Sequence, residues 1–301
     1  MDSTTVDEYA TLNSHLWRVF VLSKSKSAAL PLVRDQLEAL TNALRHPHGP
    51  TMQQRLCALA GDLFQLTGEI YFDRDEYTSA AHCYTLAATA CKEANEFDLW
   101  ACAMTRHAFL GVYERQFGAA APMLQLAAVL ARRGDSHLST RHWVAAVRAQ
   151  TFAGLGDLDS CQAALDTAEQ VTHIKGQPHN GGWLRFDGSR LAEERGACYA
   201  QLGQPDRAET ALTEALSLNL SARRRGGVLT DLATLGAQRN DPEQIATHAN
   251  PALEIAKQTG SGFIARKLHR LHIRLTPLLT DQRVRRIDRQ IAALTSRTLT
   301  Q

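Results

Sequence analysis

The chain has 301 residues, of which 44% are hydrophobic and 21% are charged, and its formal net charge at pH 7 is +2. This is the composition of an ordinary soluble protein, and the length suffices for one large domain or two ordinary ones. A net charge so close to zero gives no global attraction to nucleic acid or to an anionic membrane surface.

The N-terminal twenty residues lack a basic segment, a long apolar run and a small-residue cleavage site, so we expect no signal peptide. No stretch has about eighteen uninterrupted apolar residues, so we expect no membrane-spanning segment. The six cysteines include no Cys-x-x-Cys pair, and most of them fall on apolar helix faces. These features predict a cytoplasmic protein with reduced, buried thiols.

Helical periodicity runs through the whole chain. Nearly every long segment has apolar residues at i, i+3, i+4 and i+7, whereas β-branched alternation is almost absent. Short breaks rich in Gly, Pro and Asp separate these segments. The predicted fold class is all-α, and its first helices lie in "VDEYATLNSHLWRVFVLS" and "SAALPLVRDQLEALTNALR".

From residue 51 onward, one pattern of small and apolar residues repeats. In the first unit the pattern consists of Phe64, Gly68, Tyr71, Tyr77, Ala80, Tyr84 and Ala87. The same offsets recur in four units that start at Met104, Ala145, Ala192 and Leu229. Small residues let two helices approach closely, and the larger residues fill the space between them. The pattern resembles the tetratricopeptide repeat (TPR), a helix-turn-helix unit of about 34 residues.

We therefore predict a TPR-like, right-handed superhelical solenoid of antiparallel helix pairs. The expected organisation is N-terminal capping helices in residues 1–50, five TPR-like hairpins in residues 51–260 and C-terminal capping helices in residues 261–301. Capping units cover the apolar core that a solenoid otherwise exposes at its ends. The alternative interpretation is an irregular helical bundle.

Four segments in order carry a more specific resemblance. They are "LPLVRDQLEALTNAL", "LAGDLFQLTGEIYFDRDEYTSAAHCYTLAATAC", "FAGLGDLDSCQAALDTAE" and "WLRFDGSRLAEERGACYAQLGQPDRAETALTEAL". Together they are similar to the TPR-containing C-terminal region of actinobacterial XRE-type helix-turn-helix transcriptional regulators, over roughly residues 28–295. The resemblance implies a regulatory sensor or interaction module. The first sixty residues lack the two short helices around a Gly-containing turn that a DNA-binding module needs, so we do not expect direct DNA binding.

The first helix of each TPR hairpin lines a concave groove, where a peptide, a small molecule or a partner protein would bind. Exposed aromatic side chains in a groove are costly unless they contact something, so three aromatic residues are the predicted anchors. The predicted ligand or partner contacts are Gln65, Glu69, Arg106, Phe109, Tyr113, Trp143, Gln150, Arg190 and Glu193. An equally weighted alternative is that these side chains pack against a neighbouring helix or against the longest insertion.

That insertion contains "GQPHNGGWLRFDGSR", with Trp183 and Phe186. A loop with two aromatic residues usually folds back onto the protein. Two interpretations stay open: the loop covers the groove as a lid, or its aromatic residues only fasten a long connection to the core.

We expect no enzyme activity, no cofactor and no metal. The sequence has no phosphate-binding, dinucleotide-binding, metalloprotease or nucleophile-elbow motif, and the pair His269 and His272 lacks a third ligand. An enzyme with a site in the groove therefore ranks third. The second-ranked function is a nucleic-acid-binding regulator that uses basic C-terminal helices, which carry Arg266, Lys267, Arg270, Arg274, Arg283, Arg285, Arg286 and Arg289. A homodimer is also left open.

Overall fold

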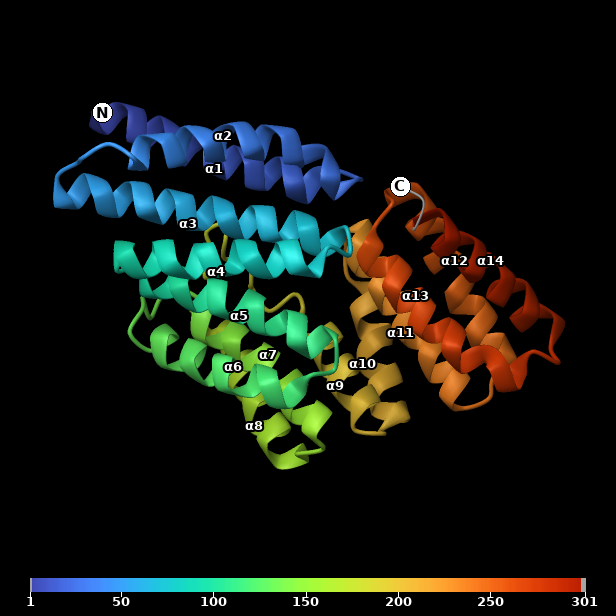
Figure 1. Cartoon of the computed structure of the whole chain (residues 1–301). Coiled ribbons are helices and arrows are strands. Elements are labelled where there is room, and N and C mark those ends of the chain that lie inside the picture. The colour runs from blue at the N-terminus through green and yellow to red at the C-terminus, as the bar shows by residue number, and fades with distance from the viewer. Residues whose placement is uncertain (1, 299–301) are drawn as a thin grey trace. The chain divides into compact units, whose positions relative to one another are not determined.

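The structure, a computed structural model, describes residues 2–298. The elements of this part are α-helices joined by turns and by one long connection, with three 3₁₀ segments and no strand among the described residues (Figure 1). The first eight helices are α1 (Ser3–Leu22), α2 (Leu30–Leu44), α3 (Pro50–Asp73), α4 (Tyr77–Ala94), α5 (Phe97–Tyr113), α6 (Phe117–Ala131), α7 (Thr140–Leu155) and α8 (Leu158–Glu169).

The remaining helices are α9 (Leu191–Gln201), α10 (Pro205–Ser217), α11 (Ala222–Gln238), α12 (Pro242–Thr259), α13 (Gly262–Leu275) and α14 (Gln282–Thr298). The 3₁₀ segments are η1 (Lys26–Ala29), η2 (Gln170–His173) and η3 (Thr276–Leu278). The all-α class predicted from the sequence is confirmed.

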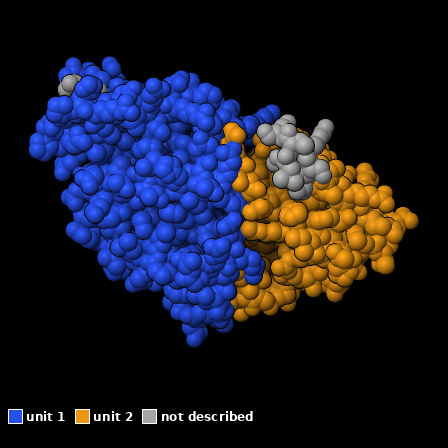
Figure 2. All heavy atoms as spheres, viewed as in Figure 1, with its two compact units in different colours: residues 1–72, 76–194 blue, residues 73–75, 195–301 orange. Residues whose placement is uncertain are grey.

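The chain forms two compact units, which Figure 2 shows in different colours. Unit 1 comprises residues 1–72 and 76–194, and unit 2 comprises residues 73–75 and 195–301.

In the region where the sequence predicts five hairpins, the consecutive helix pairs are α3–α4, α5–α6, α7–α8, α9–α10 and α11–α12. All five turn in the same way, through one residue with positive φ that lies seven positions after the small residue of the first helix. These residues are Asp75, Arg115, Gly156, Gly203 and Asn240. The next N–H donates back to the carbonyl five positions earlier, as from Glu76 to Tyr71 at 3.0 Å and from Gln204 to Tyr199 at 2.9 Å. This left-handed ending satisfies carbonyls that a helix otherwise leaves without a partner.

The repeated small residues sit where two helices touch. A Cβ added to Gly68 of α3 would overlap the ring of Tyr84 of α4, which is almost fully buried. In unit 2, a Cβ added to Gly196 would lie 2.5 Å from Cγ of Leu212. The same position of the repeat therefore needs a glycine in both hairpins because a large residue of the partner helix fills the space.

In unit 1, α1, α2 and α3 share an apolar cluster that contains Trp17, Phe20, Leu40 and Leu63. Helix α5 packs against α4, α6 and α7. None of the six cysteines forms a disulfide, and all six are buried, as expected. In unit 2, helices α11 to α14 enclose a separate apolar cluster, to which α13 contributes Ile264, Leu268, Leu271 and Leu275. No helix among the described residues is long and apolar enough to cross a membrane.

Candidate binding site on the first helices of the hairpins

Seven of the predicted contact residues lie on α3, α5 and α7, and Arg190 and Glu193 lie at the start of α9. The surface of interest consists of the sides of α3, α5 and α7 that carry Gln65, Arg106 and Trp143, together with the start of α9. We call this surface the helix-A face. The structure brings Gln65, Glu69, Arg106 and Trp143 together around the guanidinium of Arg106. Their packing side by side follows from the stacking of consecutive hairpins, because residues 41 positions apart on neighbouring first helices become neighbours in space.

Arg106 is the centre of this group, although its side chain is only 6% exposed. Its Nη1 donates to Oε1 of Gln65 at 2.5 Å, and its Nη2 donates to the main-chain carbonyl of Trp183 at 2.6 Å. Its Nε lies 3.4 Å from Oε1 of Glu69. A buried guanidinium is stable only when such partners replace the water that it has lost.

Two indole rings complete the surroundings of this guanidinium. The Cζ atom of Arg106 lies 4.8 Å from the ring centroid of Trp143 and 5.6 Å from that of Trp17. A cation over an aromatic ring is attracted by about 0.5–2 kcal/mol, with the larger values where water is excluded. The half-buried Trp143 thus has its ring against a charge instead of lying fully in solvent.

The polar network continues from Glu69 and from Asp62. Tyr84 donates its hydroxyl to Oε1 of Glu69 at 3.0 Å. Asp62 accepts from Nε1 of Trp17 at 2.6 Å and from Nδ2 of Asn13 at 2.9 Å. Burial raises the pKa of Asp62 to about 6, against these hydrogen bonds and the nearby Arg106, which lower it.

The predicted anchors Phe109 and Tyr113 belong to an aromatic cluster at the C-terminal ends of α3 and α5. Tyr113 is buried, and its ring lies 5.3 Å from that of Phe72 and 5.9 Å from that of Tyr77. Phe109 is half-buried, and its ring stacks on Tyr113 at 6.3 Å. Of these two anchors, Phe109 therefore retains more surface for a ligand.

The predicted polar contacts at the other side of the face are Gln150, Arg190 and Glu193, and all three are half-buried. Gln150 donates its amide to Oε2 of Glu194, the neighbour of Glu193. Glu194 was not among the predicted contacts. It lies beside Glu193 on the first turn of α9.

The long connection between α8 and α9, residues 174–190, folds onto the same face. Leu184 and Phe186 are at most 2% exposed and join an apolar cluster with Cys102 and Ala146. Burial raises the pKa of Cys102 to about 12, against the neighbouring Arg106, which lowers it. Around Arg106 and Trp143, the helix-A face thus packs against the insertion, as in the alternative interpretation of these residues.

Sequence reasoning missed Asn13 and Trp17, which reach this network from α1. Both residues fall in a segment that was interpreted as a terminal cap, and nothing in the local pattern indicates that one side of that helix carries hydrogen-bond donors to α3. Trp183 was considered only for its ring, whereas its main-chain carbonyl makes the contact with Arg106.

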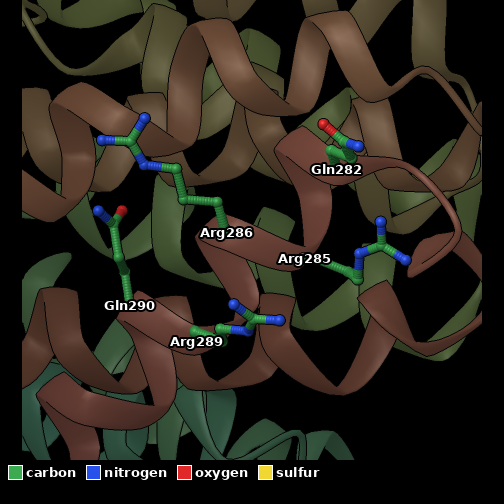
Figure 3. Close-up of a pocket in the computed structure, with 5 residues that line it drawn as sticks. All are labelled: Gln282, Arg285, Arg286, Arg289 and Gln290. Carbon is green, nitrogen blue, oxygen red and sulfur yellow. The ribbon is translucent and has the colours of Figure 1, made fainter.

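A second charged surface lies on α14 in unit 2. An open depression of about 350 Å³ is lined by Gln282, Arg285, Arg286, Arg289 and Gln290, and Figure 3 shows these five side chains. In contrast to Arg283, which pairs with Asp281 at 2.9 Å, the three arginines have no acidic partner among the described residues. Elsewhere on α14, Asp288 pairs with His272 of α13 at 2.7 Å.

No group of three or more His, Cys, Asp or Glu side chains that could hold a metal ion occurs within residues 2–298. The rings of His269 and His272 stack at 6.1 Å.

No protein-family model matches the sequence, and no curated protein matches it. Among solved structures, the chain is similar to a Rap protein complexed with Competence and Sporulation Factor. The TM-score is 0.54, the sequence identity is 11%, and the match covers 98% of this chain and 99% of that chain. At this identity the similarity shows the fold alone, which is that of a TPR-like helical solenoid.

Proposed function

We propose that the chain is a non-catalytic regulatory module that binds a peptide or a partner protein on the helix-A face of unit 1. The observation that carries the proposal is the contact of Arg106 with a main-chain carbonyl at 2.6 Å, beside the half-buried rings of Trp143 and Phe109. A buried guanidinium that holds a peptide carbonyl, next to aromatic surface, provides the polar and apolar contacts that peptide recognition requires.

The role in transcriptional regulation is a further part of the proposal. It is supported by the resemblance to the C-terminal region of XRE-type regulators and agrees with the TPR-like fold. In this proposal the solenoid carries the surface that binds the ligand. This surface consists of Gln65, Glu69, Arg106, Phe109, Trp143, Gln150, Arg190 and Glu193. The buried ring of Tyr113 stacks against that of Phe109 and helps to hold it in place.

The test is a binding screen with a library of short peptides, read by thermal shift and then by fluorescence anisotropy. Ligand that binds only the native state raises the melting temperature by mass action. We expect Trp143→Ala and Phe109→Ala to weaken binding by roughly tenfold or more, since aromatic anchors dominate such interfaces. The control is Leu126→Ala on α6, where an apolar side chain that is 43% exposed lies away from this face. Equal affinity in all four proteins would contradict the proposed location.

A second candidate function is binding of a polyanion by α14. It is favoured by the three arginines of the depression, Arg285, Arg286 and Arg289, which have no acidic partner in the described part of the chain. A planar guanidinium group matches the geometry of a phosphate, and binding of phosphates by several such groups depends strongly on salt.

A further inference from the structure

Residues 180–186 of the long connection lie on the helix-A face in the manner of a bound peptide. Leu184 and Phe186 enter the apolar cluster formed with Cys102. Between them in sequence, Arg185 has its Cζ 4.9 Å from the ring centroid of Trp17 and 5.6 Å from that of Phe20, two residues of another apolar cluster. The side chains of residues 184–186 thus contact two different clusters, and Trp183 packs against both.

The main chain of this segment is also recognised. The carbonyl of Trp183 accepts from Nη2 of Arg106, as described above. On the preceding turn, Oδ1 of Asn180 accepts from the N–H groups of Gly182 at 3.0 Å and Leu184 at 3.1 Å. This turn fixes the segment locally and so helps to hold the carbonyl of Trp183 against the guanidinium of Arg106.

Nothing in the length of the connection requires these contacts. A chain of 17 residues between two helices could run over the surface, as most connections do. Here it places two nearly fully buried apolar side chains, one cation and one carbonyl against the surface that the sequence predicted as a binding groove.

We propose that residues 180–186 are an internal ligand of the helix-A face, and that the external ligand is a peptide of the same chemistry that replaces them. Such a peptide presents two apolar side chains two residues apart, a basic side chain between them for Trp17, and a carbonyl for Arg106. The inference rests on the proposed function and adds the ligand class and the competition with the chain's own segment.

The consequence is a built-in control of affinity. A face that is occupied by its own segment binds an external peptide more weakly, in proportion to the fraction of molecules in which the segment is released. If the segment is released in a tenth of the molecules, the apparent affinity falls about tenfold relative to a face that is permanently open.

The experiment uses a synthetic peptide with the sequence of residues 179–188, HNGGWLRFDG, labelled with fluorescein. Its affinity is measured by anisotropy for the wild-type protein and for an opened variant, in which residues 180–186 are replaced by a Gly-Ser segment of equal length. We expect the opened variant to bind the peptide at least about tenfold more tightly than the wild type. A peptide with Trp and Phe replaced by Ala is the control for the probe.

Two further variants test the contacts. In the opened variant, Arg106→Gln removes the donor to the carbonyl and is expected to weaken peptide binding, whereas Arg106→Lys retains a cation and should lose less. The matched control in the connection is Gln177→Ala, because this residue is exposed and precedes the segment. It should bind the peptide as weakly as the wild type does.

Each outcome decides the inference. A folded opened variant that binds no peptide, or binds it as weakly as the wild type, overturns it. If the opened variant does not fold, the peptide is added during refolding: recovery of helical circular dichroism supports an internal ligand, and no recovery at millimolar peptide overturns it.

The result is also separable from that of the proposed function. Foreign peptides that bind the wild type and lose affinity in Trp143→Ala, together with no binding of the chain's own peptide, would sustain the binding role and reject the internal ligand. Binding of the chain's own peptide, without binding of any foreign peptide, would sustain the internal ligand and reject the proposed binding of a foreign peptide.

Discussion

Trp17 donates its indole N–H to Oδ1 of Asp62 at 2.6 Å, at a place where the indole has no exposure and the carboxyl has 8%. The bond joins α1 to α3 and fixes the ring that lies beside Arg106. A carboxyl in such a place keeps its proton to a higher pH than one in water, because burial penalises its charged form.

The first prediction concerns the pH dependence of the free energy of unfolding. The pKa of Asp62 is about 6 in the folded protein, above its ordinary value of 3.8. Between these values the folded protein holds a proton that the unfolded chain has released. The stability that the neutral carboxyl contributes is thus fully present below about pH 4 and is lost as the pH rises through about 6. The loss by pH 7 is of the order of 3 kcal/mol.

The measurement is urea unfolding of the wild type and of Asp62→Asn at pH values from 4 to 7. The amide still offers an acceptor to Trp17 but does not titrate. As the pH rises from 4 to 7, the free energy of unfolding of the wild type should therefore fall relative to that of the variant. A difference that stays constant over this range would mean that Asp62 titrates normally.

The repeat offsets explain why the hairpins were predictable from the sequence and why the site was predictable only in part. Small residues at the repeat positions of Gly68 and Ala80 predict a close crossing of two helices, because both positions belong to the same hairpin. The partners of Arg106 come from α1, α3, α7 and the long connection, and they depend on how distant segments pack. An amphipathic pattern shows which side of the helix that carries Trp17 is buried, but it does not identify the segment that covers that side.

The second prediction tests the small residues of the repeat. Gly68→Ala places a methyl group in the ring of Tyr84 and should reduce the free energy of unfolding by about 1–3 kcal/mol, the usual cost of overpacking. Gly111→Ala is the matched control in α5, because its Cβ would make only ordinary van der Waals contacts, the nearest with Cβ of Ala120 at 3.4 Å. This substitution should stabilise by roughly 0.5–1 kcal/mol through helix propensity. Chemical denaturation measures both, and equal effects would contradict the packing argument.

The third prediction isolates the left-handed turns. Gly203 has a φ of +71° and open space around it, so Gly203→Ala should cost about 1 kcal/mol through backbone strain alone. Gly118→Ala is the control on α6, where the Cβ also meets nothing within 4 Å and no positive φ is required. It should be neutral or stabilising. The idea fails if the two alanine variants have the same unfolding midpoint.

The fourth prediction concerns the thiols. Burial raises the pKa of Cys83 to about 11 and that of Cys102 to about 12, so the reactive thiolate is scarce at pH 8. The native protein should react with a chromogenic disulfide only at the rate at which it opens, and all six cysteines should react at once in denaturant. Rapid reaction of Cys102 in the native protein, located by mass spectrometry, would show that the long connection leaves the helix-A face often.

The last prediction tests α14 as a polyanion surface. Binding of duplex DNA of random sequence is measured by anisotropy over a range of salt concentrations. If Arg285, Arg286 and Arg289 contact phosphates, replacing all three by Gln should lower the slope of log affinity against log salt by about 2–3, since each released phosphate contact contributes about 0.9. Arg283→Gln is the control, because Asp281 already pairs with this guanidinium. A slope unchanged in the triple variant, or no binding by the wild type at low salt, would leave α14 as a solvated capping helix whose arginines keep the outer side of the last helix in water.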